Sequence, residues 1–568
     1  MKIKHLFGLA VIAAMTASCS SNEDLGTAGP GTGTNEAGVG YATFTINLPT
    51  TSGTRADANP EFDKGDANEY KVNDATLLIF KKDATGYQFK ESVDLGNMEP
   101  WTSSSTDGIT TTAKLTAKIT KAEVGSDKGY YALIILNNNS KTAAKITEPT
   151  DQTYEEWSKD DKKVNVTNYL KHDNGFFMAN APKYVAGAPE TLVEIKNIYA
   201  SKQQAENSTA TTVYVERGLA KVSLASTSSE HVDISGGNYD GDHVDITGWT
   251  LDVTNTKTFP IHVTDGLSAD TWKTTATTAA TNGATMDRFH DTKLTEFPRV
   301  YWGLDPNYSK SFASVADCEG EFKMATTADF KKGEDAKKAQ YCLENTFDID
   351  HMVQGQTTRV LFSANYKPAG FAADETFYKM GNSSQLWNAD KVVAQIKAKA
   401  QEVLGETDAD KVGVTLNASG NDMTKAGVYL VEAVNVQHNS VNISPDDALK
   451  INAKLGFKKA TATDAAVGLS TFESGVSYYI ARVKHFGDAL TPWNPGNKTY
   501  DKNNANWLGR YGVLRNNWYE LTVESVSGPG YPDIPKVNPT DPDDVNDQYI
   551  NVEVKILSWA KRSQNVKL

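Results

Sequence analysis

Cysteine is the residue type whose chemistry this sequence indicates most directly. Cys19 follows the small residues Thr16-Ala17-Ser18 and the apolar run Leu6–Met15, which Lys2 and Lys4 precede. A basic start, a short apolar run and small residues before a cut are typical of an export signal. Small residues directly before a cysteine also resemble a lipoprotein processing site, so we expect lipid on Cys19 and firm membrane anchoring. The alternative is an ordinary cleaved signal followed by an incidental cysteine.

The two other cysteines, Cys318 and Cys342, lie in the second half of the chain. An oxidising compartment permits a disulfide bridge between them. On the chain-entropy model, closing that loop would stabilise the fold by roughly 3 kcal/mol. The equal alternative is two small buried residues. No Cys/His spacing in the sequence predicts a zinc site.

Other polar clusters give little support for catalysis. The densest cluster contains His231, Asp233, Asp240, Asp242, His243 and Asp245. Such oxygens and imidazoles could bind a metal, but their spacing fits no EF-hand and favours a solvated hairpin loop. The sequence also contains no phosphate-binding loop, no HExxH and no strand–GxSxG–helix elbow. We therefore expect no enzyme activity, no metal and no cofactor.

The bulk composition favours an extracellular β protein. The chain has 568 residues, enough for two or three domains, with a formal net charge of −14 and 10% aromatic residues. A negative surface keeps the protein soluble and argues against nucleic acid as a partner, because nucleic-acid-binding proteins need basic patches. Beyond the signal, no segment is apolar enough to cross a membrane.

Two similar alternating segments lie near the ends of the chain. The apolar positions are Ala42, Phe44, Ile46 and Leu48 in the first segment, and Ile550, Val552, Val554 and Ile556 in the second. Both patterns predict half-buried β-strands with one apolar face. The loop at 49–56 is small, polar and open to proteolysis. A chain that loses one terminal strand and carries a similar strand at its other end could polymerise.

Between these segments, strand patterns recur at 76–80, 113–119 and 130–136, with turn residues between them. Short strands with such turns predict a β-sandwich. A strand pair candidate at 213–224 is broken at Gly218, and we place a domain boundary near residue 225. A second set of strands begins at 249–253.

Two helices are expected inside the second region. The first covers about 387–404, with Asp390 as its cap. Its packing stripe contains Val393, Ile396, Ala400, Val403 and Leu404. The second covers 445–455, with Ser444 as its cap and Pro445 at the first helical position. A Pro- and Asp-rich linker then leads to the final strand.

Four strings of this sequence resemble a known family. They are Val215-Glu216-Arg217-Gly218-Leu219-Ala220-Lys221-Val222, Tyr301-Trp302-Gly303-Leu304-Asp305-Pro306-Asn307-Tyr308, Tyr341-Cys342-Leu343-Glu344-Asn345-Thr346 and Tyr511-Gly512-Val513-Leu514-Arg515-Asn516-Asn517-Trp518-Tyr519. Their order and spacing resemble the Bacteroidia-type (type V) fimbrilins, specifically the major subunit of short fimbriae. The sequence departs from that pattern at Asn517, where the family often has His.

The resemblance implies an all-β protein with two transthyretin-like β-sandwich domains, minor helical insertions, a detachable N-terminal strand and a C-terminal donor strand. It also implies trimming by an Arg-specific protease, carried here to the bond between Arg55 and Ala56. Arg55 is the only Lys or Arg between Cys19 and Lys64. The chain then divides into a signal (1–18), a lipidated propeptide with the first strand (19–55), two sandwiches (56–225 and 226–530), and a linker with the donor strand (531–568).

In this interpretation the cut strand leaves an apolar groove, and the terminal strand of another copy enters it. Addition of a strand in this head-to-tail manner builds an open filament. The expected partners are other copies of the chain, anchor and tip fimbrial proteins, the protease, and a host or bacterial surface ligand; the filament would support adhesion and biofilm formation. One alternative is that the terminal strand pairs within its own domain. Another is a monomeric surface lipoprotein that binds glycan or host protein through aromatics such as Trp493, Trp507 and Trp518.

Overall fold

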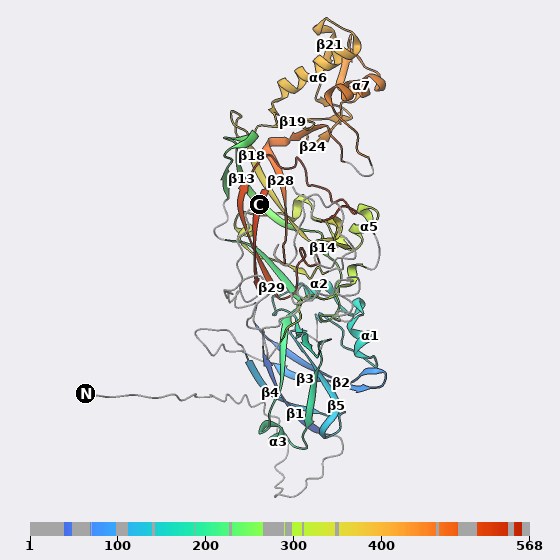
Figure 1. Ribbon diagram of the computed structural model, residues 1–568, viewed down its shortest axis with the longest axis vertical. Helices are drawn as coiled ribbons and strands as arrows, with labels where there is room; N and C mark the ends of the chain where they lie inside the picture. The colour runs from blue at the N-terminus through green and yellow to red at the C-terminus, as the bar shows by residue number, and fades with distance from the viewer. Residues whose placement is uncertain are drawn as a thin grey trace, which may run out of the picture.

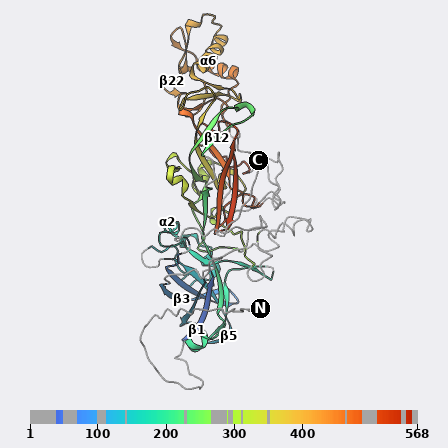
Figure 2. The ribbon, with the colours of Figure 1, turned by 90° about the vertical axis from the view of Figure 1, so that its left-hand side faces the viewer.

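The computed structural model is an elongated rod with three parts stacked along its long axis (Figure 1). An N-terminal β-sandwich lies at one end, a C-terminal β-sandwich in the middle and a mixed helical insertion at the other end, and the order is the same in the perpendicular view (Figure 2). The structure describes residues 39–47, 69, 71–97, 112–138, 143–186, 188–225, 230–264, 289, 298–308, 312–346, 351–461, 465–486, 508–543 and 550–558.

The N-terminal sandwich is built from one bent sheet. Its strand order is β3 (Gly86–Asn97), β2 (Asp74–Asp83), β5 (Gly125–Leu136), β6 (Met178–Asn180), β10 (Thr211–Arg217), β1 (Gly40–Asn47) and β4 (Thr112–Ile119), with β9 (Val193–Ile198) also paired to β5. The two ends of the sheet come together, because buried Glu91 on β3 accepts backbone hydrogen bonds from Thr120 and Lys121, directly after β4. One hydrophobic core fills the space inside.

The C-terminal sandwich consists of two facing sheets. The first has the order β17 (Gln340–Leu343), β11 (Leu219–Leu224), β29 (Asn517–Val526) and β30 (Ile550–Ser558). The second has the order β12 (His231–Asp233), β13 (His243–Asp252), β18 (Arg359–Lys367) and β28 (Val476–Arg482), with β16 (Lys331–Lys332) beside β13. Their inward side chains, such as Tyr519 from the first sheet and Phe362 from the second, form a second core. The expectation of an all-β protein with minor helical insertions is therefore confirmed.

The chain passes from the first sandwich to the second between β10 and β11. The predicted strand pair at 213–224 is present as β10 and β11, but these strands do not pair with each other and belong to different sheets. The hydrophobic core changes between Leu219 and Ala220, slightly before the boundary expected near 225. Gly218 separates the two strands, and a Cβ atom there would lie 1.9 Å from the Tyr169 hydroxyl oxygen. Only glycine fits this contact without displacing the tyrosine.

The helical insertion has a core of its own. It begins with β19 (Phe377–Met380) and ends with β27 (Leu469–Phe472), which pair with each other. Between them lie α6 (Ala389–Leu404) and α7 (Pro445–Leu455), whose buried side chains include Ile396 and Ile451. At the base of the insertion the rings of Phe377 and Phe472 are stacked, with centroids 4.5 Å apart.

The caps of these helices test the sequence expectations directly. Ser444 caps α7 as expected, by accepting a hydrogen bond from the Asp447 N–H. The expected cap of α6 is wrong: Asn388 accepts from the Lys391 N–H, and Asp390 lies in the first turn. Asn388, two residues before Asp390, therefore begins the helix. The Asp390 carboxylate still lies in the first turn, where the helix dipole favours negative charge.

The remaining helices and strands are short. They are α1 (Tyr154–Ser158), α2 (Val166–Tyr169), α3 (Lys202–Glu206), α5 (Val315–Glu319), β7 (Lys183–Val185), β8 (Ala188–Glu190), β14 (Thr254–Asn255), β15 (Phe322–Lys323), β20 (Leu386–Trp387), β21 (Val412–Val414), β22 (Asn417–Ala418), β23 (Asn421–Asp422), β24 (Gly427–Tyr429), β25 (Val436–His438) and β26 (Val441–Asn442). Within the described residues, no helix is both long enough and apolar enough to span a bilayer.

Candidate functional site

Strand β1 occupies an interior position in the N-terminal sheet. It pairs in parallel with β10 and antiparallel with β4, so that Phe44 lies opposite Thr211 on one side and Leu115 on the other. In the described part of the chain, β4 has no other strand partner. Removal of β1 would therefore leave two rows of backbone N–H and C=O groups without ladder partners.

The two faces of β1 differ as the sequence predicts. Ala42, Phe44 and Ile46 are buried, with exposed fractions of 1%, 0% and 0%, and they belong to the N-terminal core. On the other face, the hydroxyl oxygens of Thr43 and Thr116 lie 2.8 Å apart. Burial of Phe44 and Ile46 together contributes roughly 3–6 kcal/mol. Leu48, the fourth apolar position, lies outside the described residues.

The start of β1 is fixed by a close approach of two backbones. The Tyr41 and Tyr199 backbones exchange two hydrogen bonds, each 2.8 Å long. A Cβ atom on the preceding Gly40 would lie 2.4 Å from the Ile198 Cγ2 atom. Because no larger residue fits there, the strand enters its groove in one defined position.

Strand β30 completes the sheet of its own domain in this single chain. It pairs antiparallel with β29 and is the edge strand of that sheet. Val552 and Val554 are buried in the C-terminal core, and Ile550 packs against it. The backbone of Ile556 lies opposite Tyr519, and its side chain is outside the described set. The single chain thus adopts the in-domain pairing that was one of the two alternatives, and donation to another copy stays a prediction.

The expected lipidation and cleavage sites, Cys19 and Arg55–Ala56, lie outside the described residues. The next described position is Glu69, which is 1% exposed. Its carboxylate Oε1 lies 2.7 Å from the Lys221 Nζ and accepts a 2.5 Å hydrogen bond from the Tyr341 hydroxyl. Its backbone carbonyl accepts from the Arg217 Nε at 2.8 Å. Glu69 is therefore held where the two sandwiches meet.

A second buried ionic group lies next to this contact. Glu216, the neighbour of Arg217 on β10, lies 2.6 Å from both the His262 Nδ1 and an Arg299 guanidinium nitrogen. Burial alone would raise the pKa of Glu216, but the charges of His262 and Arg299 and the hydrogen bond from His262 lower it to about 2. Sequence reasoning missed these partners, because they are distant along the chain and no local pattern links them.

The possible disulfide is not formed. Cys318 and Cys342 are free buried thiols, and they belong to different hydrophobic clusters. Burial raises the pKa of Cys318 to about 11 and that of Cys342 to about 12, which keeps both thiols protonated and unreactive. The alternative interpretation of these residues, as small buried side chains, therefore describes the structure.

The polar cluster at 231–245 forms the β12–β13 hairpin, as expected. The His231 Nδ1 lies 2.6 Å from Asp245, and buried Asp242 accepts a hydrogen bond from the Tyr366 hydroxyl. Among the residues that the structure describes, no group of three or more His, Cys, Asp and Glu side chains is arranged to hold a metal ion.

Trp518 is not the exposed aromatic contact considered for a monomeric binder. Only 9% of its surface is exposed, its Nε1–H donates to the Ser223 hydroxyl at 2.7 Å, and the Lys221 ammonium lies 3.7 Å from its ring centroid. It therefore packs in the domain junction. The other two tryptophans considered for that role, Trp493 and Trp507, lie outside the described residues.

The fold and the groove together define a class of β-sandwich protein. In this class the first described strand, β1, is buried between two neighbouring strands, and one peptide segment joins it to the rest of the chain. Residues 470–565, which include β28, β29 and β30, match the family model described as "Major fimbrial subunit protein type IV, Fimbrillin, C-terminal". For this C-terminal region the expectation of a fimbrilin-type protein is thereby confirmed.

Comparisons with other proteins give distant similarities. A candidate cell adhesion protein from Parabacteroides distasonis is 11% identical, with a TM-score of 0.37 over 92% of this chain and 99% of the other. The tip fimbrial protein Mfa3 from Porphyromonas gingivalis, with a C-terminal truncation, is 10% identical, with a TM-score of 0.29 over 91% of this chain and 100% of the other. A search of curated proteins finds no match.

Proposed function

We propose that the chain is the structural shaft subunit of a cell-surface fimbria. It is exported as a lipoprotein through Cys19, cut after Arg55, and polymerised head to tail by exchange of β1 for the C-terminal strand of a neighbouring copy. The family match to its C-terminal region supports a fimbrial role. The filament then presents the subunits for adhesion and biofilm formation.

The observation that carries this proposal is the position of β1 between β10 and β4. While β1 is covalently attached, its effective concentration at the groove is high and no competitor can displace it. One cut in the segment after β1 makes it a separate peptide that carries the lipid. Its loss then becomes favourable once another strand can fill the groove.

Hydrogen bonding favours entry of β30 into the groove once β1 has left. Among the described residues, β30 is an edge strand of its own domain and pairs with β29 alone. In the vacated groove the same strand would pair on both sides, with β10 and with β4. Once β1 has left, transfer of β30 to a neighbour breaks one ladder, with β29, and forms two, with β10 and β4. Each additional backbone hydrogen bond contributes about 0.5–1.5 kcal/mol.

A photo-crosslinking experiment tests the proposal. A benzoylphenylalanine at position 116 on β4 lies beside the strand that fills the groove, because Thr116 contacts Thr43. We expect crosslinks to the leading peptide before cutting and to the peptide that contains residues 550–558 of another copy in assembled fibres. The same crosslinker at Glu194, an exposed position on β9, should form neither product.

The result that overturns strand exchange is a purified fibre in which position 116 still crosslinks to the original leading peptide. An independent check replaces Arg55 with Gln, which removes the site for an Arg-specific protease. This variant should accumulate as a lipidated monomer that does not assemble.

A further inference from the structure

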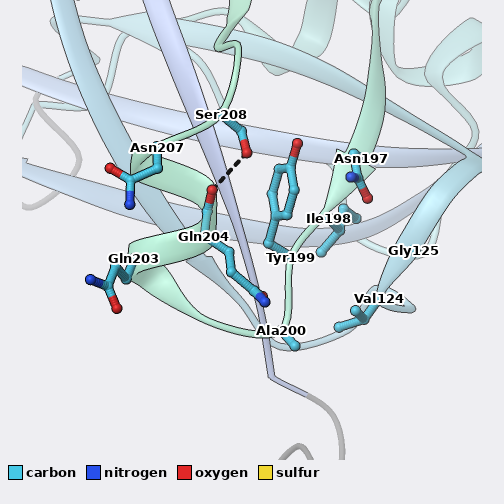
Figure 3. A pocket seen from close by; sticks show the side chains of 10 residues that line it. All are labelled: Val124, Gly125, Asn197, Ile198, Tyr199, Ala200, Gln203, Gln204, Asn207 and Ser208. Atoms are coloured by element: carbon cyan, nitrogen blue, oxygen red, sulfur yellow. Dashed lines mark hydrogen bonds between the residues drawn. The ribbon is translucent and has the colours of Figure 1, made fainter. Parts of the chain in front are cut away.

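A pocket of about 520 Å³ opens on the N-terminal sandwich, between α3 and the strand β9 (Figure 3). Helix α3 lies at the end of the rod opposite the helical insertion (Figure 1). The residues that define the chemistry of the pocket are Val124, Asn197, Tyr199, Gln203, Gln204 and Asn207. Its volume lies within the range typical of small-molecule sites, about 300–1,000 Å³.

The lining of this pocket is polar but carries no charge. None of its residues is Asp, Glu, Lys, Arg or His, although 23% of the whole chain is charged. Four of the lining residues, Asn197, Gln203, Gln204 and Asn207, carry side-chain carboxamides around the Tyr199 ring, those of Gln203 and Asn207 pointing outward (Figure 3). Within the described residues, none of these carboxamides makes a hydrogen bond with the protein. Each carboxamide offers an acceptor oxygen and two donor hydrogens. These groups are therefore available to a ligand that presents both donors and acceptors.

Tyr199 supplies an aromatic surface among these amides (Figure 3). Its ring is half-buried, and its backbone is fixed by the paired hydrogen bonds with Tyr41. Gln203, Gln204 and Asn207 are exposed on or just after α3. The pocket thus combines one positioned aromatic ring with several adaptable amides.

We propose that this pocket binds a neutral saccharide. A sugar ring has hydroxyl groups that pair with carboxamides and an apolar C–H face that stacks on a tyrosine ring. An apolar ligand would leave the amides desolvated without partners, and a charged ligand would find no counterion within the pocket. The proposal concerns the uncut chain, in which β1 is in place, because Tyr41 of β1 holds the Tyr199 backbone.

The adjoining groove provides an internal comparison. It shares Val124 with the pocket, but its lining includes Lys81, Lys90 and Lys121 together with Glu123. Lys121 is exposed. If charge held the ligand, rather than the amides and the tyrosine ring, this groove would be its binding site. Replacement of Lys121 would then weaken binding.

Saturation-transfer difference NMR on the full chain tests the proposal with galactose, mannose, N-acetylglucosamine and lactose as probes. We expect at least one of these to bind. Combined replacement Gln204→Ala and Asn207→Ala should weaken binding roughly tenfold or more, since each lost hydrogen bond costs about two- to tenfold. Tyr199→Ala should abolish the signal, whereas Tyr199→Phe retains the stacking ring and should keep most of it.

Matched controls separate binding from folding. Lys121→Ala and Gln385→Ala remove an exposed side chain outside the pocket and should leave binding unchanged. Because Gln204 and Asn207 are exposed, their replacement should not change the thermal unfolding temperature. The proposal is overturned if none of the four sugars binds, if the amide variants bind as the unmodified chain does, or if Lys121→Ala abolishes binding.

Discussion

At the residue scale, the domain junction depends on close packing and on buried charge pairs. The crossing places Gly218 against the Tyr169 ring, and the adjacent Glu216 and Arg217 are buried among charged partners. Removal of one member of a buried ion pair leaves the other charged and desolvated, which costs about 3–5 kcal/mol. Single substitutions here should therefore act on the joint between the sandwiches.

Glu216→Gln should change how stability depends on pH. Because the folded pKa of Glu216 is lowered to about 2 from a reference value of 4.5, its stabilising effect is complete above pH 4.5 and is lost as the pH falls toward 2. We expect the variant to be less stable at pH 7 and to lose less stability on acidification. Urea unfolding at pH 7 and pH 3 measures both effects; equal losses in variant and parent would contradict the prediction. Glu402→Gln, at an exposed pair, is the control.

Gly218→Ala should destabilise the chain by about 1–3 kcal/mol, the usual cost of overpacking. The reason is that the added Cβ atom would lie only 1.9 Å from the Tyr169 hydroxyl oxygen. Adding Tyr169→Phe removes that oxygen and should recover part of the loss, which a double-mutant cycle measures. If the two changes are simply additive, the contact is not the cause.

At the element scale, β1 and β30 could be predicted from sequence because alternation alone defines a half-buried strand. The strands that pair with β1 could not be predicted, because β4 and β10 lie far along the chain. The same limit explains why the local pattern predicts β10 and β11 as one pair and gives no sign of the role of Glu69. The predicted cap of α6 is wrong for a local reason: Asn388 and Asp390 are both good cap residues, and the sequence does not decide between them.

Phe44→Ala should weaken the uncut chain only. The buried ring leaves a cavity whose cost is typically 3–5 kcal/mol, so the N-terminal sandwich of the precursor should unfold at a lower temperature. Assembled fibres have lost β1 in the proposed mechanism, and their resistance to denaturant should equal that of unmodified fibres. Calorimetry of the precursor and denaturant titration of the fibre distinguish the cases; weaker fibres would show that β1 is still present.

At the scale of the whole molecule, the rod separates three structural units along its axis (Figure 1). The strand that we propose is released lies in one sandwich, its proposed replacement in the other, and the helical insertion stands beyond both. Composition and strand spacing predict the two β regions, but nothing local shows that residues 377–472 enclose a separate core. The separate core follows from the pairing of β19 with β27, which no local pattern predicts.

Deletion of the insertion should therefore spare the rest of the chain. Phe377 and Phe472 are directly opposite each other, so a two-residue Asn-Gly turn can join β19 to β27 after removal of residues 381–468. We expect the shortened chain to fold with an unchanged C-terminal core and to form fibres. Loss of assembly with normal folding would assign the insertion a role in contacts between subunits.

The stacked pair of phenylalanines at the base of the insertion also marks a graft point. Any foreign domain whose two ends lie as close together as paired strand residues can be spliced between them without stretching the host sandwich. In a polymer of identical subunits, such a passenger would recur once per repeat, at a constant height above the shaft. A fibre of the proposed kind would therefore offer a regularly spaced array for antigens or enzymes, with the density of cargo set by the length of one subunit.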